Sequence, residues 1–460
     1  MPAPPGLRLP PPLQVAWLVA DPMRFFAAGR RHGPVFQIRL PGMPPEVCVA
    51  TADLAEQVLA ADGAGGRAGA VRRGFLGPLV GEASLLTLDE DPWWRHRRLL
   101  GPPLHGRAVA RWAERVAEIA AADVDRWPLG EPFALRTRME RITLEVIMRV
   151  VFGIRDAGRL RRLRVLLPRL VALGGNAAVV RLPPGPREWL LTSPLPQRAG
   201  FLPTTRFARV RAQVDAILYD EMARRRRDPD PDAGDVLSQL LAARDEAGEP
   251  LTDREVRDEL ITLLVAGHET TATALAWTFE RLVRTPRVLE RLRDELAAGD
   301  GRAYLDAVIK ESLRVRPVVL ATPRALAEPM TVGGHQVPAG WCVAAIIPLV
   351  HSDPEVFPEP GEFRPERFLG PDAAKANRAW LPFGGGRRYC AGAQLALLQM
   401  RVIVTEVLRR VELRPADPAP ERARLKSVTL VPARSTRVVA TPAGSRSGSA
   451  VTEVGEEAGE

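Results

Sequence analysis

The chain has 460 residues, and its 64 lysines and arginines against 55 aspartates and glutamates give a formal net charge of +9. Its three cysteines, Cys48, Cys342 and Cys390, are too few and too widely spaced for a disulfide framework, which indicates a reducing compartment. No apolar run reaches the ~18 residues of a membrane span, and the first residues lack the pattern of a signal peptide, so we predict a cytoplasmic chain with no membrane span.

The positive charge is carried almost wholly by arginine and is spread over many predicted helices. The one tight run, Arg224–Arg227, precedes the acidic and proline-rich segment Asp228–Asp232 and is more typical of a solvated helix end. We therefore predict no nucleic-acid binding, although a basic chain leaves that alternative open. We interpret the positive charge instead as a basic face that binds an acidic protein partner.

The N-terminal part begins with a proline-rich lead over residues 1–14. Two strands are predicted next, at Val35–Leu40 and Glu46–Thr51, because they flank a proline- and glycine-rich turn. From Leu54 to about Glu280 the apolar periodicity is mostly helical. Proline- or glycine-rich breaks interrupt it at residues 182–203 and 228–234.

Trp94 and Arg98 lie one turn apart on a predicted helix. A planar and permanently charged guanidinium at this spacing suits a carboxylate ligand. An exposed basic helix with a packed tryptophan is an equally good interpretation of these two residues taken alone.

A helix of ~33 residues is predicted from Thr252 to just before Pro286, with Thr252 and Glu255 forming a capping box. Its middle contains Gly267, Glu269 and Thr270 inside an apolar run. Glycine costs about 1 kcal/mol in a helix interior relative to alanine. Several residues that are unfavourable in a buried helix, when they occur together, indicate a functional site. A helix glycine beside a solvated glutamate is the alternative.

Glu311 and Arg314 share one helix face and can form an ion pair, although such pairs usually lie on solvated surfaces. Arg324 follows a proline and, alone, could be an ordinary surface arginine. Short strands are predicted around Met330–Val337 and Cys342–Ile347, and Arg367 lies in a proline-containing segment after them. Residues 441–460 are rich in Gly, Ser and Glu, which predicts a disordered tail.

The segment Phe383–Gly392 has the sequence FGGGRRYCAG and places Cys390 in a glycine-rich loop before a helical pattern at Leu395–Val404. Glycines allow the backbone to approach a flat cofactor closely, and loop N–H groups stabilise a thiolate without adding a competing base. The following helix N-terminus also favours an anion. The loop therefore predicts a thiolate that binds a metal, with a buried and inert cysteine as the alternative.

The pattern F-x-x-G-x-R-x-C-x-G resembles the haem-binding loop of the cytochrome P-450 superfamily at every fixed position. Upstream segments, in family order, resemble its W-x-x-x-R, [AG]-G-x-[DE]-T, E-x-x-R and P-E-R-F elements. The resemblance implies a mainly α fold with a small β region, with residues 15–440 as a single haem domain. It also implies that Glu311, Arg314 and Arg367 form a buried salt-bridge triad with a structural role.

By this resemblance, Cys390 is the metal ligand and haem b (iron protoporphyrin IX) is the cofactor. Thr270 and Glu269 become the catalytic alcohol and acid that deliver protons to bound oxygen. The remaining cofactor-binding residues implied are Trp94, Arg98, Arg324, Arg388, Phe383, Gly384 and Gly267. Of these, Trp94, Arg98, Arg324 and Arg388 would reach the haem propionates.

The implied activity is a monooxygenase that inserts one oxygen atom of O2 into a lipophilic small molecule. Because no reductase domain follows the haem loop, we expect electrons to come from a ferredoxin or flavodoxin with an NAD(P)H-dependent reductase. We also expect a monomer. Family positions facing substrate correspond to Phe75, Leu76, Leu85, Leu263, Ala266, Val318, Val319 and Leu430. A peroxide-driven relative, a thiolate-haem sensor or carrier, and a haem-free helical interaction protein remain as alternatives.

Overall fold

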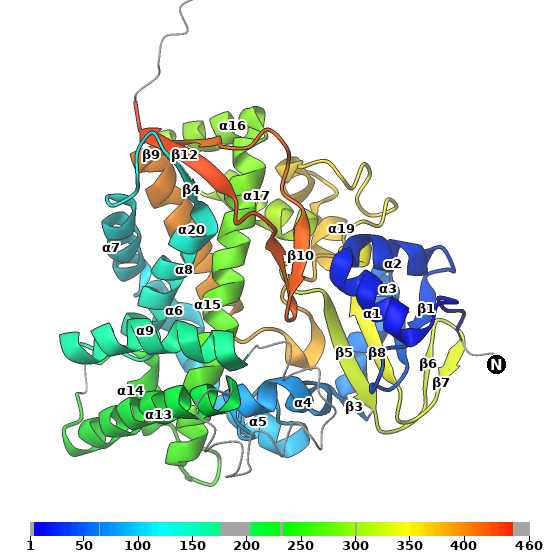
Figure 1. The fold of residues 1–460 in the computed structure, drawn as a ribbon, viewed down its shortest axis with the longest axis horizontal. Helices are drawn as coiled ribbons and strands as arrows, with labels where there is room; N and C mark the ends of the chain where they lie inside the picture. The colour runs from blue at the N-terminus through cyan, green and yellow to red at the C-terminus, as the bar shows by residue number, and fades with distance from the viewer. Residues whose placement is uncertain (1–3, 64, 175–202, 231–232, 300, 445–460) are drawn as a thin grey trace, which may run out of the picture.

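A computed structural model describes residues 4–63, 65–174, 203–230, 233–299 and 301–444. Helices make up most of the molecule, and a smaller strand-rich region lies at one side together with the N-terminal helices (Figure 1). This arrangement confirms the predicted mainly α class with a small β region. The predicted break at 182–203 and all but the first few residues of the predicted tail lie outside the described residues.

The helices cover the chain from the N-terminal segment to residue 410. They are α1 (Pro11–Ala20), α2 (Pro22–Arg30), α3 (Ala52–Ala60), α4 (Ala68–Val80), α5 (Glu90–Leu100), α6 (Gly106–Ala110), α7 (Ala113–Val124), α8 (Leu135–Val146), α9 (Ala157–Gly174), α13 (Pro203–Arg227), α14 (Val236–Ala242), α15 (Asp253–Val283), α16 (Pro286–Ala298), α17 (Ala303–Val315), α18 (Ile347–Val350), α19 (Ala373–Arg378) and α20 (Ala393–Arg410).

The strands form four small sheets in the described part of the chain. Their bounds are β1 (Val35–Ile38), β2 (Glu46–Val49), β3 (Gly66–Arg67), β4 (Pro132–Ala134), β5 (Ala321–Leu326), β6 (Met330–Val332), β7 (His335–Val337), β8 (Cys342–Ile346), β9 (Val411–Pro415), β10 (Ala423–Lys426), β11 (Thr429–Pro432) and β12 (Arg437–Pro442). The largest sheet has the order β1-β2-β8-β5-β3. The strands predicted near residues 35–51, 330–337 and 342–347 are confirmed, with ends trimmed by one or two residues.

The N-terminal segment is more ordered than a plain lead. Helix α1 begins at Pro11, inside the proline-rich stretch, because proline is tolerated in the first helical turn where its missing N–H has no intrahelical partner. Gly6 also forms a bridge with Gln37 of β1. The described lead therefore packs on the strand-rich region.

Helix α15 runs through the middle of the helical region and organises it (Figure 1). Thr252 and Glu255 form the predicted capping box, each side chain accepting from the other's backbone N–H. The helix continues for 31 residues and most of its side chains are buried. It packs against α4, α8, α17 and α20, so segments far apart in the sequence meet along this helix.

The salt-bridge triad anchors α17 to the segment that precedes the Cys390 loop. Arg314 lies 2.7 Å from Glu311, and Arg367 lies 3.4 Å from the same carboxylate, whose side chain is fully buried. The predicted buried triad is confirmed. Among the described residues, no helix combines the length and the apolar character that a membrane span needs.

Candidate functional site

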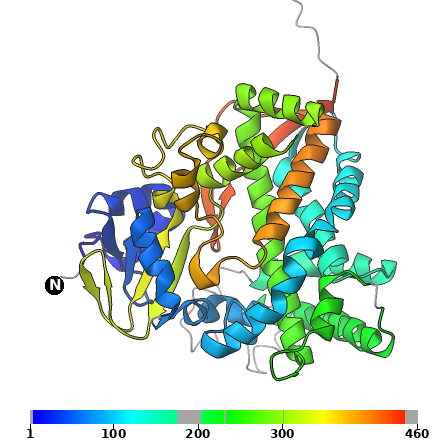
Figure 2. The ribbon, with the colours of Figure 1, turned by 180° about the vertical axis from the view of Figure 1, so that it is seen from behind.

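The Cys390 loop adopts a conformation that depends on glycine. Gly384 and Gly386 have φ angles of 68° and 61°, and a Cβ on Gly386 would lie 2.8 Å from the backbone oxygen of Leu59. The Cys390 N–H donates to Phe383 O at 3.0 Å, which closes the loop. Helix α20 then begins three residues after the cysteine (Figure 2). The predicted glycine-dependent loop and the helix that follows it are therefore confirmed.

The Cys390 sulfur lies in a partly positive environment. Burial raises the pKa of the Cys390 thiol, while the Gly392 N–H and the guanidinium groups of Arg97 and Arg72 act in the opposite direction. The sulfur is therefore shielded from water and faces one N–H donor and two guanidinium groups. No neighbouring base contributes to the pKa shift of Cys390. A bound cation would complete the stabilisation of its thiolate.

The other two cysteines lack this environment. Cys48 in β2 and Cys342 in β8 are buried in the largest sheet. Burial and the Glu46 carboxylate raise the pKa of Cys48 well above its usual value, and the same causes raise the pKa of Cys342 to about 12. Cys390 is therefore the cysteine suited to bind a metal as a thiolate. In the described residues, no group of three or more His, Cys, Asp or Glu could hold a metal ion instead.

Arg324 and Arg388, which the sequence predicts as two carboxylate-binding residues, come together at one aspartate. Arg324 lies 2.8 Å from Asp62, and Arg388 lies 3.7 Å from Asp62 and 2.6 Å from Asp89. Both side chains are nearly excluded from solvent, at 1% and 6% exposed. The two arginines therefore form a shared cationic cluster beside the Cys390 loop.

Arg72 extends this cluster toward the sulfur. Burial and the charges of Arg324 and Arg388 lower the pKa of Arg72 to about 10, and Arg72 in turn acts on Cys390. Arg72, Arg324 and Arg388 face the two aspartates, which leaves an excess of one positive charge, and Arg97 is a half-buried fourth cation that acts on Cys390. Arg72 was missed in the sequence because nothing local distinguishes it from its neighbour Arg73.

The predicted pair of Trp94 and Arg98 is not what approaches Cys390. Arg98 has a side chain 55% exposed and pairs with Glu246 at the surface. One residue earlier, Arg97 acts on Cys390, and Trp93 lies under the Arg388 guanidinium at 4.3 Å. The same Trp-x-x-x-Arg spacing occurs in both registers, and the packing of α5 turns the first of them inward. The structure therefore assigns the inward position to the residues just before the predicted ones.

Gly267, Glu269 and Thr270 lie on α15, where they line or adjoin the cavity. Thr270 Oγ1 donates to Ala266 O one turn earlier, a contact typical of helical threonines. A Cβ on Gly267 would lie 3.2 Å from Ile147, so this glycine makes room for the segment after α8. Gly267 therefore packs closely against Ile147, and its predicted contact with the cofactor stays a prediction.

Glu269 belongs to a cluster of charges that the sequence did not indicate. Its Oε1 lies 2.9 Å from Arg136 Nη2 and 2.7 Å from Lys426 Nζ. Arg136 Nη2 also lies 2.8 Å from Glu140. His268 is buried beside them, and desolvation lowers its pKa to about 4. Glu269 therefore points at two cations, whereas the Thr270 hydroxyl donates to Ala266 O.

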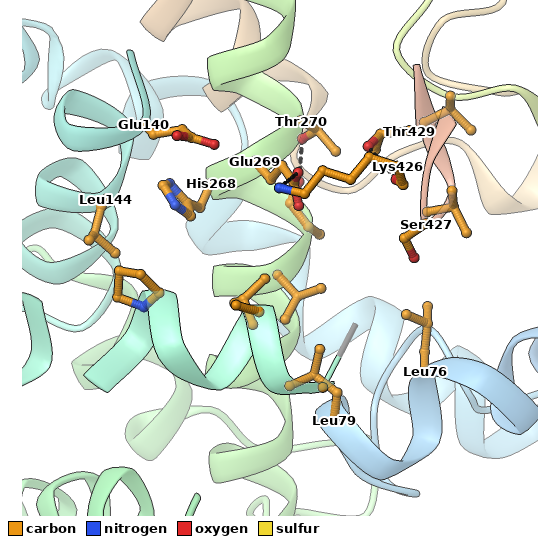
Figure 3. A pocket seen from close by; sticks show the side chains of 18 of the residues that line it. Leu76, Leu79, Glu140, Leu144, His268, Glu269, Thr270, Lys426, Ser427 and Thr429 are labelled. Atoms are coloured by element: carbon orange, nitrogen blue, oxygen red, sulfur yellow. Dashed lines mark hydrogen bonds and ion pairs between the residues drawn. The ribbon is translucent and has the colours of Figure 1, made fainter. Parts of the chain in front are cut away.

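A cavity of about 1510 Å³ opens beside this part of α15 (Figure 3). Its wall near Thr270 includes the apolar side chains of Val265, Ala266 and Leu320. Four of the eight predicted substrate-facing residues line it, namely Phe75, Leu76, Ala266 and Val319. The other four, Leu85, Leu263, Val318 and Leu430, do not line it, and all but Leu263 are buried in the core.

A family model described as Cytochrome P450 matches residues 4–438. The chain belongs to the cytochrome P450 family. "Putative cytochrome P450 135B1" of Mycobacterium bovis is 43% identical over 442 residues, which cover 95% of this chain and 90% of the relative. "Putative cytochrome P450 137" of Mycobacterium tuberculosis is 38% identical over 452 residues, which cover 96% and 91%.

Solved structures agree with this assignment at the level of the fold. The structure described as "Retinoic acid bound cyanobacterial CYP120A1" has a TM-score of 0.80 and 24% identity, covering 96% of this chain and all of the other. The cytochrome P450DA heme domain has a TM-score of 0.81 and 23% identity over 96% and 98%. The predicted fold is therefore confirmed as the cytochrome P450 fold.

This cytochrome P450 is a haem-thiolate monooxygenase, and its cofactor is haem b. The described residues fit that group on two counts. A desolvated thiol faces an N–H donor and two guanidinium groups, as an axial thiolate requires. The excess positive charge of the cluster of Arg72, Arg324 and Arg388, with Arg97 acting on Cys390 as a further cation, suits the acidic propionates of haem b.

Proposed function

We propose that the Cys390 thiolate would bind the haem iron and that Arg72, Arg97, Arg324 and Arg388 would hold the propionates. The environment of the Cys390 sulfur carries this proposal, because the other cysteines are buried in a sheet beside a glutamate. Phe383 and Gly384 would hold the loop in shape, because Phe383 O accepts from the Cys390 N–H and Gly384 has a positive φ. The bound haem supplies activation of O2 and transfer of one oxygen atom.

On the cavity side, Thr270 and Glu269 are the proposed proton-handling residues. The Thr270 hydroxyl borders the cavity, and its present acceptor is a backbone oxygen of its own helix, so it can turn to another acceptor at small cost. Glu269 is held in place by ion pairs with Arg136 and Lys426. Glu140, on the far side of Arg136, extends the line of acids away from Thr270.

The proposed substrate is a lipophilic small molecule. Apolar side chains from α4, α15 and the segment before β5 line the cavity beside Thr270. Burying such a ligand against them gains roughly 25 cal/mol per Å² of apolar surface.

Electrons are proposed to arrive from a separate acidic protein, a ferredoxin or flavodoxin with its NAD(P)H-dependent reductase. Arg387 in the Cys390 loop is exposed, and Arg98 and Arg107 are exposed on nearby elements. Helix α6 is tied to the start of α20 because Gln394 accepts from the Gly106 N–H. A basic surface around the thiolate loop would attract an acidic partner and speed its association.

The axial role is tested with the spectrum of the reduced carbon monoxide complex. Cys390→Ala should abolish the red-shifted band of a thiolate-ligated haem, while Cys342→Ala, which removes a thiol from the sheet, should keep it. A red-shifted band in the Cys390→Ala protein would refute the assignment.

The role of Thr270 is tested by coupling. Thr270→Ala should keep NAD(P)H consumption but divert much of it to peroxide, because the hydroxyl that directs protons is gone. Thr271→Val changes a buried neighbour that does not line the cavity and should leave coupling near wild type. Unchanged coupling in Thr270→Ala would defeat the assignment.

A further inference from the structure

Lys426 reaches into the cavity from an unusual place. It is one of only three lysines in the chain, and it ends β10 at the tip of the β10–β11 hairpin. Its side chain lines the cavity and is 48% exposed, and the next residue, Ser427, has a positive φ of 56°. Figure 3 shows the side chain extending from the hairpin toward Glu269. A flexible cation therefore stands among the lining groups of the substrate cavity.

Lys426 is the replaceable partner of Glu269. The carboxylate Oε1 is shared by Lys426 Nζ at 2.7 Å and Arg136 Nη2 at 2.9 Å. Arg136 is only 9% exposed and also donates toward Thr273 and pairs with Glu140, so packing and several contacts hold it in place. If Lys426 moved to another anion, Glu269 would keep a buried guanidinium partner. The exchange would therefore leave no unpaired buried charge on α15.

We propose, on the basis that this cavity is the substrate site, that Lys426 binds the carboxylate of a lipophilic carboxylic acid and exchanges Glu269 for it. The apolar wall beside Thr270 takes the hydrocarbon body, and the ammonium takes the head group. The ammonium of Lys426 is the cation at the Glu269 end of the cavity, and its single charge matches a monovalent carboxylate.

The charges around Lys426 support a carboxylate and add a second observable. Arg136 and Glu140 face it from α8, and His268 and Glu269 face it from α15. The charges of Glu140 and Glu269 balance those of Arg136 and Lys426 while His268 stays neutral. A bound carboxylate therefore adds one unbalanced negative charge. Burial raises the pKa of Glu140, and the nearby Glu269 acts in the same direction against Arg136 and Lys426. We therefore expect Glu140 to take up a proton when the acid binds.

The experiment is titration calorimetry of the haem-loaded full chain with lauric, palmitic and oleic acids and the methyl ester of each. At least one acid should bind wild type about tenfold more tightly than its ester, the size of one charge-assisted hydrogen bond. Lys426→Met should reduce the ratio to near one, and Lys426→Arg should retain it. Lys375→Met, at an exposed lysine on α19, is the matched control and should behave as wild type.

Proton uptake is measured by repeating the acid titration in buffers of different ionisation enthalpy. Binding should take up a proton in wild type, and Glu140→Gln should abolish that uptake. The proposal is overturned if no acid is preferred over its ester, or if Lys426→Met keeps the preference. A lost carbon monoxide signature with an intact preference for acids would instead refute the proposed thiolate ligand and leave the Lys426 subsite standing.

Discussion

Replacing Glu311 by glutamine tests the energetic argument for the buried triad. The Glu311 side chain is fully buried, and its oxygens accept from Arg314 Nε at 2.7 Å, Arg314 Nη2 at 2.8 Å and the Arg364 N–H at 2.9 Å. Glutamine keeps one acceptor and turns an NH2 donor against the Arg314 guanidinium. Two charge-assisted bonds at roughly 1.5–3 kcal/mol each are weakened or lost, so we expect a stability loss of about 3–5 kcal/mol.

The assay is urea unfolding of the haem-loaded chain, followed in parallel by far-UV circular dichroism and by haem absorbance. The matched control is Glu118→Gln, which breaks an exposed pair between Arg115 and Glu118 of the same spacing, with both side chains 56% exposed. That pair should contribute less than about 1 kcal/mol. If Glu311→Gln and Glu118→Gln shift the unfolding midpoint equally, the buried triad does not stabilise the fold in the way argued here.

Three further predictions concern pH and the haem site. Burial lowers the pKa of His351 to about 3, so below pH ~6.5 this residue binds a proton in the unfolded chain but not in the folded chain. The free energy of unfolding, measured by urea titration, should therefore be full above pH ~6.5 and fall toward pH ~4. His351→Gln should show a shallower dependence on pH. Arg97→Leu should speed haem loss to apomyoglobin several-fold while Arg98→Leu does not, and equal rates would contradict the inward register of α5. Gly386→Ala should lower the haem content of the purified protein, because its φ is 61° and its Cβ would clash with a backbone oxygen, whereas Gly392→Ala meets open space and should be tolerated; normal haem content in Gly386→Ala would count against the loop geometry.

Features that depend on a few neighbouring residues could be predicted from the sequence. The Cys390 loop is such a feature, because its glycines, its closing contact and the helix that follows lie within a short stretch of chain. The capping box of α15 is another, since Thr252 and Glu255 complete it between themselves. The pairing of Glu311 with Arg314 also follows from helical spacing alone.

Other features were decided by packing between distant segments. Spacing on α5 is satisfied equally by Trp93 with Arg97 and by Trp94 with Arg98, and only the burial of one helix face distinguishes them. Likewise, α15 alone does not show whether Gly267 faces a cofactor or a neighbouring helix.

The amino-acid sequence by itself determined the family, the glycine-rich loop that carries Cys390 and the long helix, because each depends on residues close together in the chain. Only the tertiary structure decided which arginines surround Cys390 and that Lys426 and Arg136 share the Glu269 carboxylate. The physical reason is that charge pairing and burial act through space. Arginines and glutamates are common throughout this chain, so their positions in the sequence do not say which of them will meet.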